Sequence, residues 1–274
     1  MKMTFWKSTI LATALLGVAA VTAAAQNRSQ ERGLRCDENS RGDRASNCAI
    51  KEMRIPATAS INIDGGQNGG ASVRGDDRED IFIRAKIQTY ADTDAQAKEL
   101  AGQIRIETNG GSIRAEGPVN DGKQQWAVSY EILVPRRSDV SVKTHNGGIS
   151  FSDVRGRIEF EAQNGGVSLQ RLAGAVHGRT RNGGLSIDLA GDRWDGEGLD
   201  VSTTNGGISL TLPENYSAQL ETSTVNGGLK VDFPVTVQGR IDRELSLNLG
   251  SGGATVKATT TNGGVHLKRI TANE

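Results

Sequence analysis

Residues 140–151 read VSVKTHNGGISF, and the same arrangement returns at residues 158–169 as IEFEAQNGGVSL. The shared tripeptide Asn-Gly-Gly occurs eight times in the 274 residues, and a degenerate copy, Ser-Gly-Gly, stands at residues 251–253. From the third copy to the seventh, the spacings are 18, 18, 23 and 21 residues. A near-constant period of this length is typical of repeat architectures. The copies begin at Asn68, Asn109, Asn146, Asn164, Asn182, Asn205, Asn226 and Asn262.

Apolar and polar residues alternate on both sides of each tripeptide. Around the copy at residue 205, every second residue is Leu199, Val201 and Thr203 before the tripeptide and Ile208 and Leu210 after it, with polar residues between them. Alternation with a period of two is the signature of strands that have one buried face. Each repeat is therefore predicted to consist of a strand, an Asn-Gly-Gly corner, a second strand and a second turn.

Two architectures fit this alternation. Asn-Gly between apolar strands is also a strong signal for β-hairpins, so a meander of hairpins is one of them. The other is a β-solenoid, in which the strands around each corner lie in different sheets and successive repeats stack at about 4.8 Å. Recurring Thr two residues before Asn, and Ser four residues after it, favour the solenoid, because like residues would then stack rung on rung.

The corners are predicted to depend on backbone conformation. Glycine adopts positive φ without a Cβ clash, and Asn tolerates that region better than most residues. On this basis the structural turns are assigned to Asn146, Gly147, Asn164, Gly165, Asn182, Gly183, Asn205, Gly206, Asn226, Gly227, Asn262 and Gly263.

The first 25 residues are typical of a secretory signal peptide. Lys2 and Lys7 accompany an apolar run over residues 10–21, and three alanines before Gln26 fit a small-residue cleavage site. The run is too short for a stable membrane span, and no second apolar segment follows. The mature chain is therefore expected to lack a transmembrane segment and to be exported to the periplasm or cell surface of a bacterium.

Charge and cysteine content restrict the candidate partners. Without Lys2 and Lys7, 30 basic residues (32 − 2) stand against 32 acidic ones, which gives no argument for nucleic acid as a partner. Cys36 and Cys48 have eleven residues between them, with no CxxC motif and no nearby His. In an exported protein they predict one local disulfide rather than a metal site.

The organisation along the chain is predicted to have four parts. After the signal peptide (1–25), residues 26–54 form a polar segment with little order beyond the disulfide. Residues 55–137 are expected to cap the array, with strands near residues 81–87 and 126–134 and one helix over 92–103, capped by Asp92 or Thr93. Residues 138–274 hold the regular repeats.

Two neighbouring segments also carry a family signal. Val201–Leu210 reads VSTTNGGISL and Leu212–Gly227 reads LPENYSAQLETSTVNG. Together with the signal peptide, they resemble the DUF4097 putative-adhesin family, whose units follow V-x-V-x-T-x-N-G-x-I-x-V. The resemblance covers most of the chain from about residue 55 to 270, and its motifs are structural turns. It implies a β-helical fold and adhesion, and it implies no catalytic residues.

Catalytic motifs are not evident in the sequence. It contains no G-x-S-x-G nucleophile and no phosphate-binding P-loop. His145, His177 and His266 lack metal-ligand spacing within one repeat, so solvated side chains are the favoured interpretation. No catalytic residue, metal site or cofactor is therefore expected.

One second turn is unusually long and is a candidate ligand-binding loop. Residues 190–198 read AGDRWDGEG, so Asp192, Trp194, Asp195 and Glu197 lie close together in sequence. An exposed indole could stack on a sugar ring, or the carboxylates could bind Ca²⁺. The favoured alternative is that Trp194 folds back over the core while the carboxylates stay solvated.

The sequence therefore predicts an all-β, β-helix-like solenoid of Asn-Gly-Gly repeats, with an N-terminal cap that contains one short helix. The expected function is that of an exported, non-enzymatic adhesin, or of an envelope binding or scaffold protein with a glycan or protein partner. Two alternatives stay open: a polysaccharide-active enzyme on a β-helix, and a purely structural envelope assembly protein.

Overall fold

The computed structural model describes residues 33–36, 44–234 and 243–270. The chain separates into two units, Met1–Gly33 and Leu34–Glu274, and the description below concerns the second. The predicted signal peptide lies outside the described residues. No helix among the described residues is long and apolar enough to cross a membrane.

Two ten-stranded sheets, called sheet A and sheet B here, form the body of this unit. In spatial order, sheet A consists of β1 (Ala45–Pro56), β4 (Asp80–Ala91), β7 (Gln125–Pro135), β3 (Ala71–Asp76), β9 (Ile149–Ser152), β11 (Val167–Gln170), β13 (Leu185–Asp188), β15 (Ile208–Pro213), β20 (Val265–Ile270) and β17 (Leu229–Val231). Sheet B consists of β18 (Glu244–Leu249), β16 (Ala218–Asn226), β19 (Thr255–Asn262), β14 (Gly198–Asn205), β12 (Ala173–Asn182), β10 (Arg155–Asn164), β8 (Asp139–Thr144), β2 (Ser60–Asp64), β6 (Ser112–Glu116) and β5 (Arg105–Glu107).

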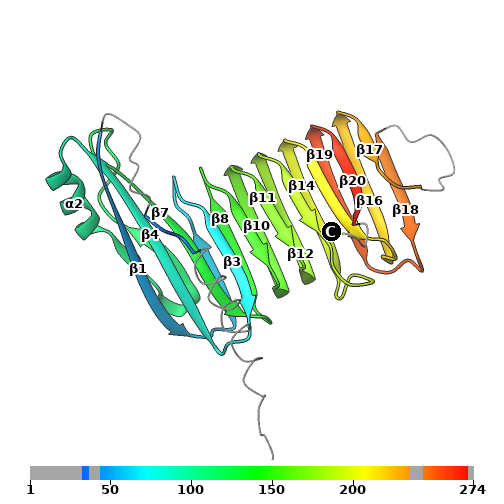
Figure 1. Cartoon of the computed structure of the whole chain (residues 1–274), viewed down its shortest axis with the longest axis horizontal. Helices are drawn as coiled ribbons and strands as arrows, with labels where there is room; N and C mark the ends of the chain where they lie inside the picture. The colour runs from blue at the N-terminus through cyan, green and yellow to red at the C-terminus, as the bar shows by residue number, and fades with distance from the viewer. Residues whose placement is uncertain (1–32, 37–43, 235–242, 271–274) are drawn as a thin grey trace, which may run out of the picture. The chain divides into compact units, whose positions relative to one another are not determined.

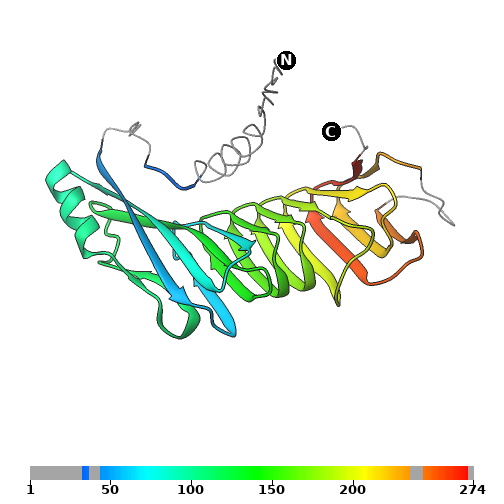
Figure 2. The same cartoon turned by 60° about the horizontal axis from the view of Figure 1, so that its bottom comes forward.

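Successive repeats each add one strand to each sheet. β10 pairs in parallel with β8 and β12, while β11 pairs in parallel with β9 and β13. The two strands around a corner therefore belong to different sheets, as Figures 1 and 2 show for the green rungs. A meander would have antiparallel neighbours. The parallel ladders thus confirm the predicted solenoid.

The core lies between the two sheets and follows the predicted alternation. Every second side chain of the repeat strands is buried, and Phe151, Ile158, Leu210 and Leu267 are fully inaccessible to solvent. In-register pairs stack like on like, for example Ser168 with Ser186 on the outer side of sheet A. Burial of this apolar column by neighbouring rungs is the main force that holds a solenoid together.

The threonine that recurs two residues before most of the corner asparagines points into the core and has a specific partner. The hydroxyl of Thr180 donates to the carbonyl of Gly165 at 2.9 Å, and that of Thr203 donates to Gly183 at 2.7 Å. Both threonines are almost fully buried. Each hydroxyl therefore satisfies a corner carbonyl of the preceding rung, which explains why a polar residue recurs in this buried column.

The corner glycines are required by close packing, and the predicted positive φ is wrong for five of the six. Of the six assigned first glycines, only Gly263 has a positive φ, 156°. A Cβ on Gly165 would lie 2.1 Å from the carbonyl oxygen of Gly147, and one on Gly183 would lie 2.1 Å from that of Gly165. The glycines stack directly on one another, so no side chain fits between the rungs. Positive φ occurs at the second turns instead, at Asp153 (59°) and Arg171 (52°).

The corner asparagines form a continuous ladder of side-chain hydrogen bonds. The amide of Asn164 donates to Asn146 at 2.8 Å, and that of Asn182 donates to Asn164 at 2.7 Å. The same contact joins every neighbouring pair in the spatial series Asn68, Asn146, Asn164, Asn182, Asn205, Asn262, Asn226. Asn is thus selected at the corners for its side chain, which both donates and accepts.

The N-terminal part differs from the repeats. Helix α2 (Asp94–Gln103) begins after Thr93, whose hydroxyl accepts from the backbone N–H of Gln96, in agreement with the predicted capping residue. β1 begins at Ala45, within the segment expected to have little order. It is ordered because it pairs antiparallel with β4 along its whole length. The coil of β2 and β3 stacks on β8 and β9 as the first full rung.

The last coil of the chain is not the last coil of the array. β19 lies between β14 and β16, and β20 lies between β15 and β17. The coil of residues 255–270 is therefore inserted between two coils that precede it in sequence. In Figure 1 this red coil stands among the yellow and orange strands. β18 pairs antiparallel with β16 and forms the edge of sheet B.

Candidate functional site

The outer face of sheet B presents polar side chains in straight rows across the strands. Parallel in-register pairing places residues of β2, β8, β10, β12 and β14 side by side, at the roughly 4.8 Å separation of paired strands. The central row alternates in charge and consists of Asp64, Lys143, Glu161 and Arg179, followed by Ser202. A second row, farther from the corners, consists of Asn62, Ser141, Glu159, His177, Asp200 and Lys257.

The middle of the central row is an ion pair between adjacent rungs. The Nη2 and Nε atoms of Arg179 donate to Glu161 Oε1 at 2.6 and 3.2 Å. This hydrogen bonding, with the charges of Arg179 and Lys143, holds the pKa of Glu161 below its usual value. Glu161 is therefore a carboxylate near neutral pH and is not suited to donate a proton.

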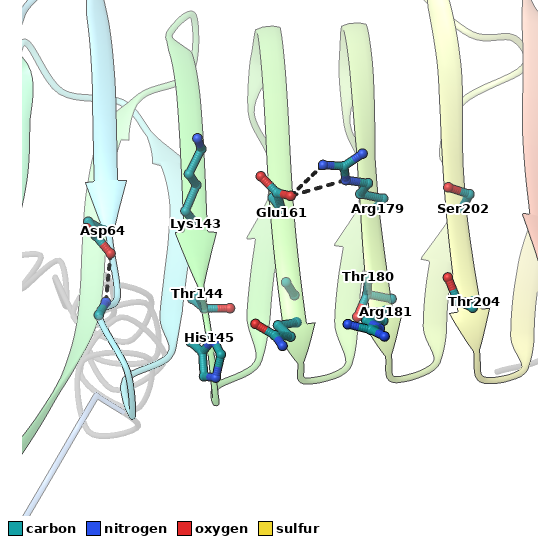
Figure 3. A pocket seen from close by; sticks show the side chains of 13 residues that line it. Asp64, Lys143, Thr144, His145, Glu161, Arg179, Thr180, Arg181, Ser202 and Thr204 are labelled. Carbon is teal, nitrogen blue, oxygen red and sulfur yellow. Dashed lines mark hydrogen bonds and ion pairs between the residues drawn. The ribbon is translucent and has the colours of Figure 1, made fainter.

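Two overlapping hollows lie along this row. One, of about 610 Å³, lies between the central row and the corners, and the other, of about 490 Å³, lies between the central and second rows. Both are lined by Lys143, Glu161, Arg179 and Ser202. Figure 3 shows these side chains projecting from neighbouring strands, with the Glu161–Arg179 pair in the middle. We call this surface, from Asp64 to Ser202, the sheet B groove.

Positive charge is in excess near the corners of the sheet B groove. Lys143, His145 and Arg181 line its larger hollow, together with the paired Arg179. Within the described residues, neither Lys143 nor Arg181 takes part in an ion pair. Asp64 also lines the hollow, and its Oδ1 accepts from the backbone N–H of Gly66 at 2.8 Å. The groove can therefore offer two cationic side chains to a ligand without breaking a salt bridge.

The outer face of sheet A has a different character. Its middle row is a line of hydroxyl groups from Ser72, Ser150, Ser168, Ser186 and Ser209. The row continues from Ser209 to His266 and Lys230. His266 contacts Asp232, and Lys230 donates to the same carboxylate at 2.9 Å. These bonds, first from Lys230 and then from His266, lower the pKa of Asp232. They join the last two coils of the array.

The candidate loop of residues 190–198 places its tryptophan inside the protein. Trp194 is only 5% exposed, and its Nε1 donates to the carbonyl of Gly174 at 2.9 Å. Trp194 is therefore not placed to stack on a sugar ring. The indole covers the core, which is the alternative that the sequence favoured. Asp195 pairs with Arg155 at 2.5 Å and Asp192 with Arg193 at 3.4 Å. Ligand binding by Asp192, Asp195 and Glu197 stays a prediction.

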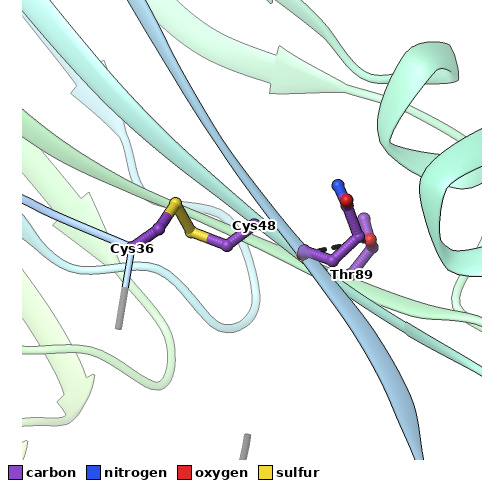
Figure 4. The surroundings of a disulfide bond; sticks show 4 residues. Cys36, Cys48 and Thr89 are labelled. Atoms are coloured by element: carbon purple, nitrogen blue, oxygen red, sulfur yellow. Dashed lines mark hydrogen bonds between the residues drawn. A yellow bond between two sulfur atoms is a disulfide. The ribbon is translucent and has the colours of Figure 1, made fainter. Parts of the chain in front are cut away.

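The predicted disulfide is present. Cys36 and Cys48 are joined, with their Cα atoms 5.7 Å apart, and Figure 4 shows the bond beside β1. Two residues before it, the backbone N–H of Leu34 donates to Glu131 of β7 at 3.1 Å. The bond therefore holds the segment before β1 against sheet A.

No group of three or more metal-ligating side chains occurs within the described ranges. The sheet B groove was not predicted from the sequence, because its side chains come from five strands that belong to different repeats. Aligning the repeats on their asparagines would have placed Glu161 beside Arg179, exactly one 18-residue repeat later. The hollows between rows have no signal in the sequence.

Comparison with known proteins gives a family model and several solved structures. The family model described as Toastrack DUF4097 matches residues 135–268. No curated protein matches the chain. A putative cell adhesion protein from Clostridium sporogenes has a TM-score of 0.42 at 9% identity, over 81% of this chain and 100% of that one. A putative adhesin from Bacteroides fragilis has 0.34 at 9% identity, over 81% and 97% of the two chains. A putative lipid binding protein from Parabacteroides distasonis has 0.28 at 10% identity, over 82% and 97%.

The matched range begins at the end of β7 and includes the Asn-Gly-Gly corners from Asn146 to Asn262. It also contains both segments, Val201–Leu210 and Leu212–Gly227, on which the family resemblance was based. The resemblance is thereby confirmed, and residues 135–268 of this chain belong to the Toastrack DUF4097 family.

Proposed function

We propose that this chain is an exported, non-enzymatic β-solenoid that binds a component of the bacterial envelope, as an adhesin or scaffold. The binding surface is the sheet B groove. The observation that carries the proposal is the set of in-register side chains that line two adjoining hollows on one face. A broad polar surface built on rigid strands is suited to a long ligand, because successive rungs place polar side chains at a regular spacing.

The charge of the groove favours a ligand with acidic groups. Lys143 and Arg181 reach the larger hollow and take part in no ion pair of the described residues, while Glu161 and Arg179 neutralise each other. Charge-assisted hydrogen bonds from such cations are about twice as strong as neutral ones. An envelope glycan or protein that carries carboxylates fits this arrangement best.

The rest of the chain has a supporting role in this proposal. Residues 1–25 direct export and are removed, so the mature protein resides in the periplasm or at the cell surface. Residues 55–137 cap the array, and residues 138–274 supply the repeats. The carboxylates of Asp192, Asp195 and Glu197, in the long turn between β13 and β14, are a second candidate contact for the ligand.

A paired substitution tests the assignment of the face. Lys143→Ala with Arg181→Ala removes two cations from the groove, whereas Arg74→Ala with Lys268→Ala removes two from the outer face of sheet A. Binding to isolated envelope fractions and to an array of acidic and neutral glycans is measured for both proteins. We expect the groove variant to lose about tenfold in affinity, equivalent to about 1.4 kcal/mol, and the control to bind like the parent. Equal binding by both variants would refute the groove as the binding surface.

The alternative functions give different results in the same preparation. A polysaccharide-active enzyme would release new reducing ends from its substrate, and the groove proposal would then be replaced. A purely structural protein would show no affinity for glycans, and would instead assemble with a partner through its ends.

A further inference from the structure

Asparagine followed by glycine is chemically labile. The backbone nitrogen of the glycine attacks Cγ of the asparagine, a carbon–nitrogen bond forms, and ammonia leaves. Water then opens the resulting succinimide at either carbonyl and yields aspartate or isoaspartate. The chain contains eight Asn-Gly pairs, all of them within the Asn-Gly-Gly copies. We propose that the fold protects the seven ladder pairs and leaves Asn109-Gly110, alone among the eight Asn-Gly pairs, open to rapid spontaneous deamidation.

Protection begins at the side chain that would be attacked. In the interior of the ladder each asparagine donates to one neighbour and accepts from the other, as Asn164 does with Asn146 and Asn182 at 2.8 and 2.7 Å. To reach the succinimide geometry, the side chain must rotate toward its own glycine and break both bonds.

The attacking nitrogen is protected as well. The N–H of Gly165 donates to the carbonyl of Asn182 at 3.0 Å, and the N–H of Gly183 donates to that of Asn205 at 2.9 Å. The same bond holds Gly206 and Gly263, with lengths of 2.9 and 3.1 Å. A nitrogen fixed in this way points toward the next rung and away from its own asparagine side chain.

Asn109 has neither form of protection. It lies outside the ladder, in the short 3-10 turn η1 (Asn109–Gly111) between β5 and β6. Its amide makes one contact at the limit of hydrogen bonding, 3.5 Å from Glu107 Oε2. Gly110 is the second residue of η1, where backbone N–H groups have no partner inside a helix. Asn109 and Gly110 are both exposed, and no atom lies within 4 Å of the position that a Gly110 Cβ would take.

The products would change this turn. Conversion of Asn109 adds a negative charge beside Glu107, and isoaspartate lengthens the backbone by one methylene just before β6. Gly111, the next residue, is packed so closely that a Cβ would lie 2.3 Å from the carbonyl oxygen of Ser60. The isoaspartate product therefore perturbs the edge of sheet B where β5 and β6 pair, and leaves the ladder intact.

Peptide mapping by mass spectrometry tests the proposal on the full folded chain. The protein is incubated in mildly alkaline buffer, and each Asn-Gly peptide is followed by the mass change of amide to acid. Every hydrogen bond that must break slows the reaction about fivefold, so three bonds make Asn164, Asn182, Asn205 and Asn262 roughly 100-fold slower than Asn109. Asn68 and Asn226, at the two ends of the ladder, keep one side-chain hydrogen bond each and should fall between these limits.

Two controls separate the fold from the local sequence. In urea all eight pairs should react at similar rates, and Asn109→Gln should abolish the fast phase in the native protein. If Asn164, Asn182 or Asn205 reacts as fast as Asn109 in the folded chain, the ladder gives no protection and the proposal fails. It also fails if Asn109 stays much the fastest site in urea, because the neighbouring sequence would then set the difference.

Discussion

The two glycines of one corner have different surroundings, although both are glycine and they are adjacent in the chain. A Cβ on Gly165 would lie 2.1 Å from a backbone oxygen, whereas one on Gly166 would lie 3.6 Å from the nearest oxygen, an ordinary contact. We expect Gly165→Ala to destabilise the protein by about 1–3 kcal/mol, because the rungs must move apart. Gly166→Ala should change the stability by about 0.5 kcal/mol or less. Urea denaturation of both variants is the measurement, and equal midpoints would contradict the stacked-corner geometry.

The comparison of the two glycines also shows how much of the corner geometry could be predicted from the sequence. The tripeptide predicts that the corners at Gly183 and Gly206 need glycine, but the structure gives a different reason, which is the short distance to the next rung. Their φ values are not positive. A tripeptide carries information only about its own backbone, whereas contact with a glycine 18 or 23 residues away depends on the register of two strands.

At the scale of one element, the asparagine ladder makes a prediction that depends on pH. Asn182→Asp removes the donor to Asn164 and places two oxygens in contact, which should cost about 1–3 kcal/mol near neutral pH. A protonated carboxyl group can still donate, so its pKa in the folded state is raised above the roughly 3.9 of the unfolded chain. The loss is therefore smallest below that value, and it grows as the pH rises through the folded-state pKa.

The matched control is Asn109→Asp, which makes the same chemical change outside the ladder. Its stability relative to the parent should stay within about 0.5 kcal/mol, as for most exposed substitutions. Thermal melting of the parent and both variants at acidic and neutral pH measures the difference. A penalty for Asn182→Asp that is the same at both pH values would show that the ladder hydrogen bond does not set it.

Strands, corners and the helix at residues 94–103 could be predicted because each has a local pattern: alternation, Asn-Gly-Gly, or a capping Thr. The order of the coils could not. The corner at Asn262 has the same flanking columns as those at Asn205 and Asn226, so nothing local places it between them. Similarly, the burial of Trp194 depends on its contact with Gly174, which lies one rung away. The charged row of the sheet B groove could likewise be predicted only if the register of its strands were known.

At the scale of the whole array, the inserted position of the last coil affects the stability of its neighbours. Solenoid repeats are stabilised by their nearest neighbours. Residues 255–270 are the neighbours of both the coil at 198–213 and the coil at 218–231. They also bury Val256, Ala258, Val265 and Leu267 almost completely. A chain that ends at Ala254 therefore loses the contact that joins residues 218–231 to the rest of the array.

We expect limited proteolysis of this shortened chain to cut quickly within residues 214–249, while the coils of residues 139–188 stay protected. The control ends at Ile270 and keeps every described strand, so its cleavage pattern should match that of the full chain. If the coils were stacked in sequence order, removal of residues 255–274 would expose only the end of the array. Protection of residues 218–231 in the shortened chain would therefore contradict the inserted position of β19 and β20. Their rapid cleavage would mean that the array becomes complete only when the last coil of the chain enters between two earlier ones.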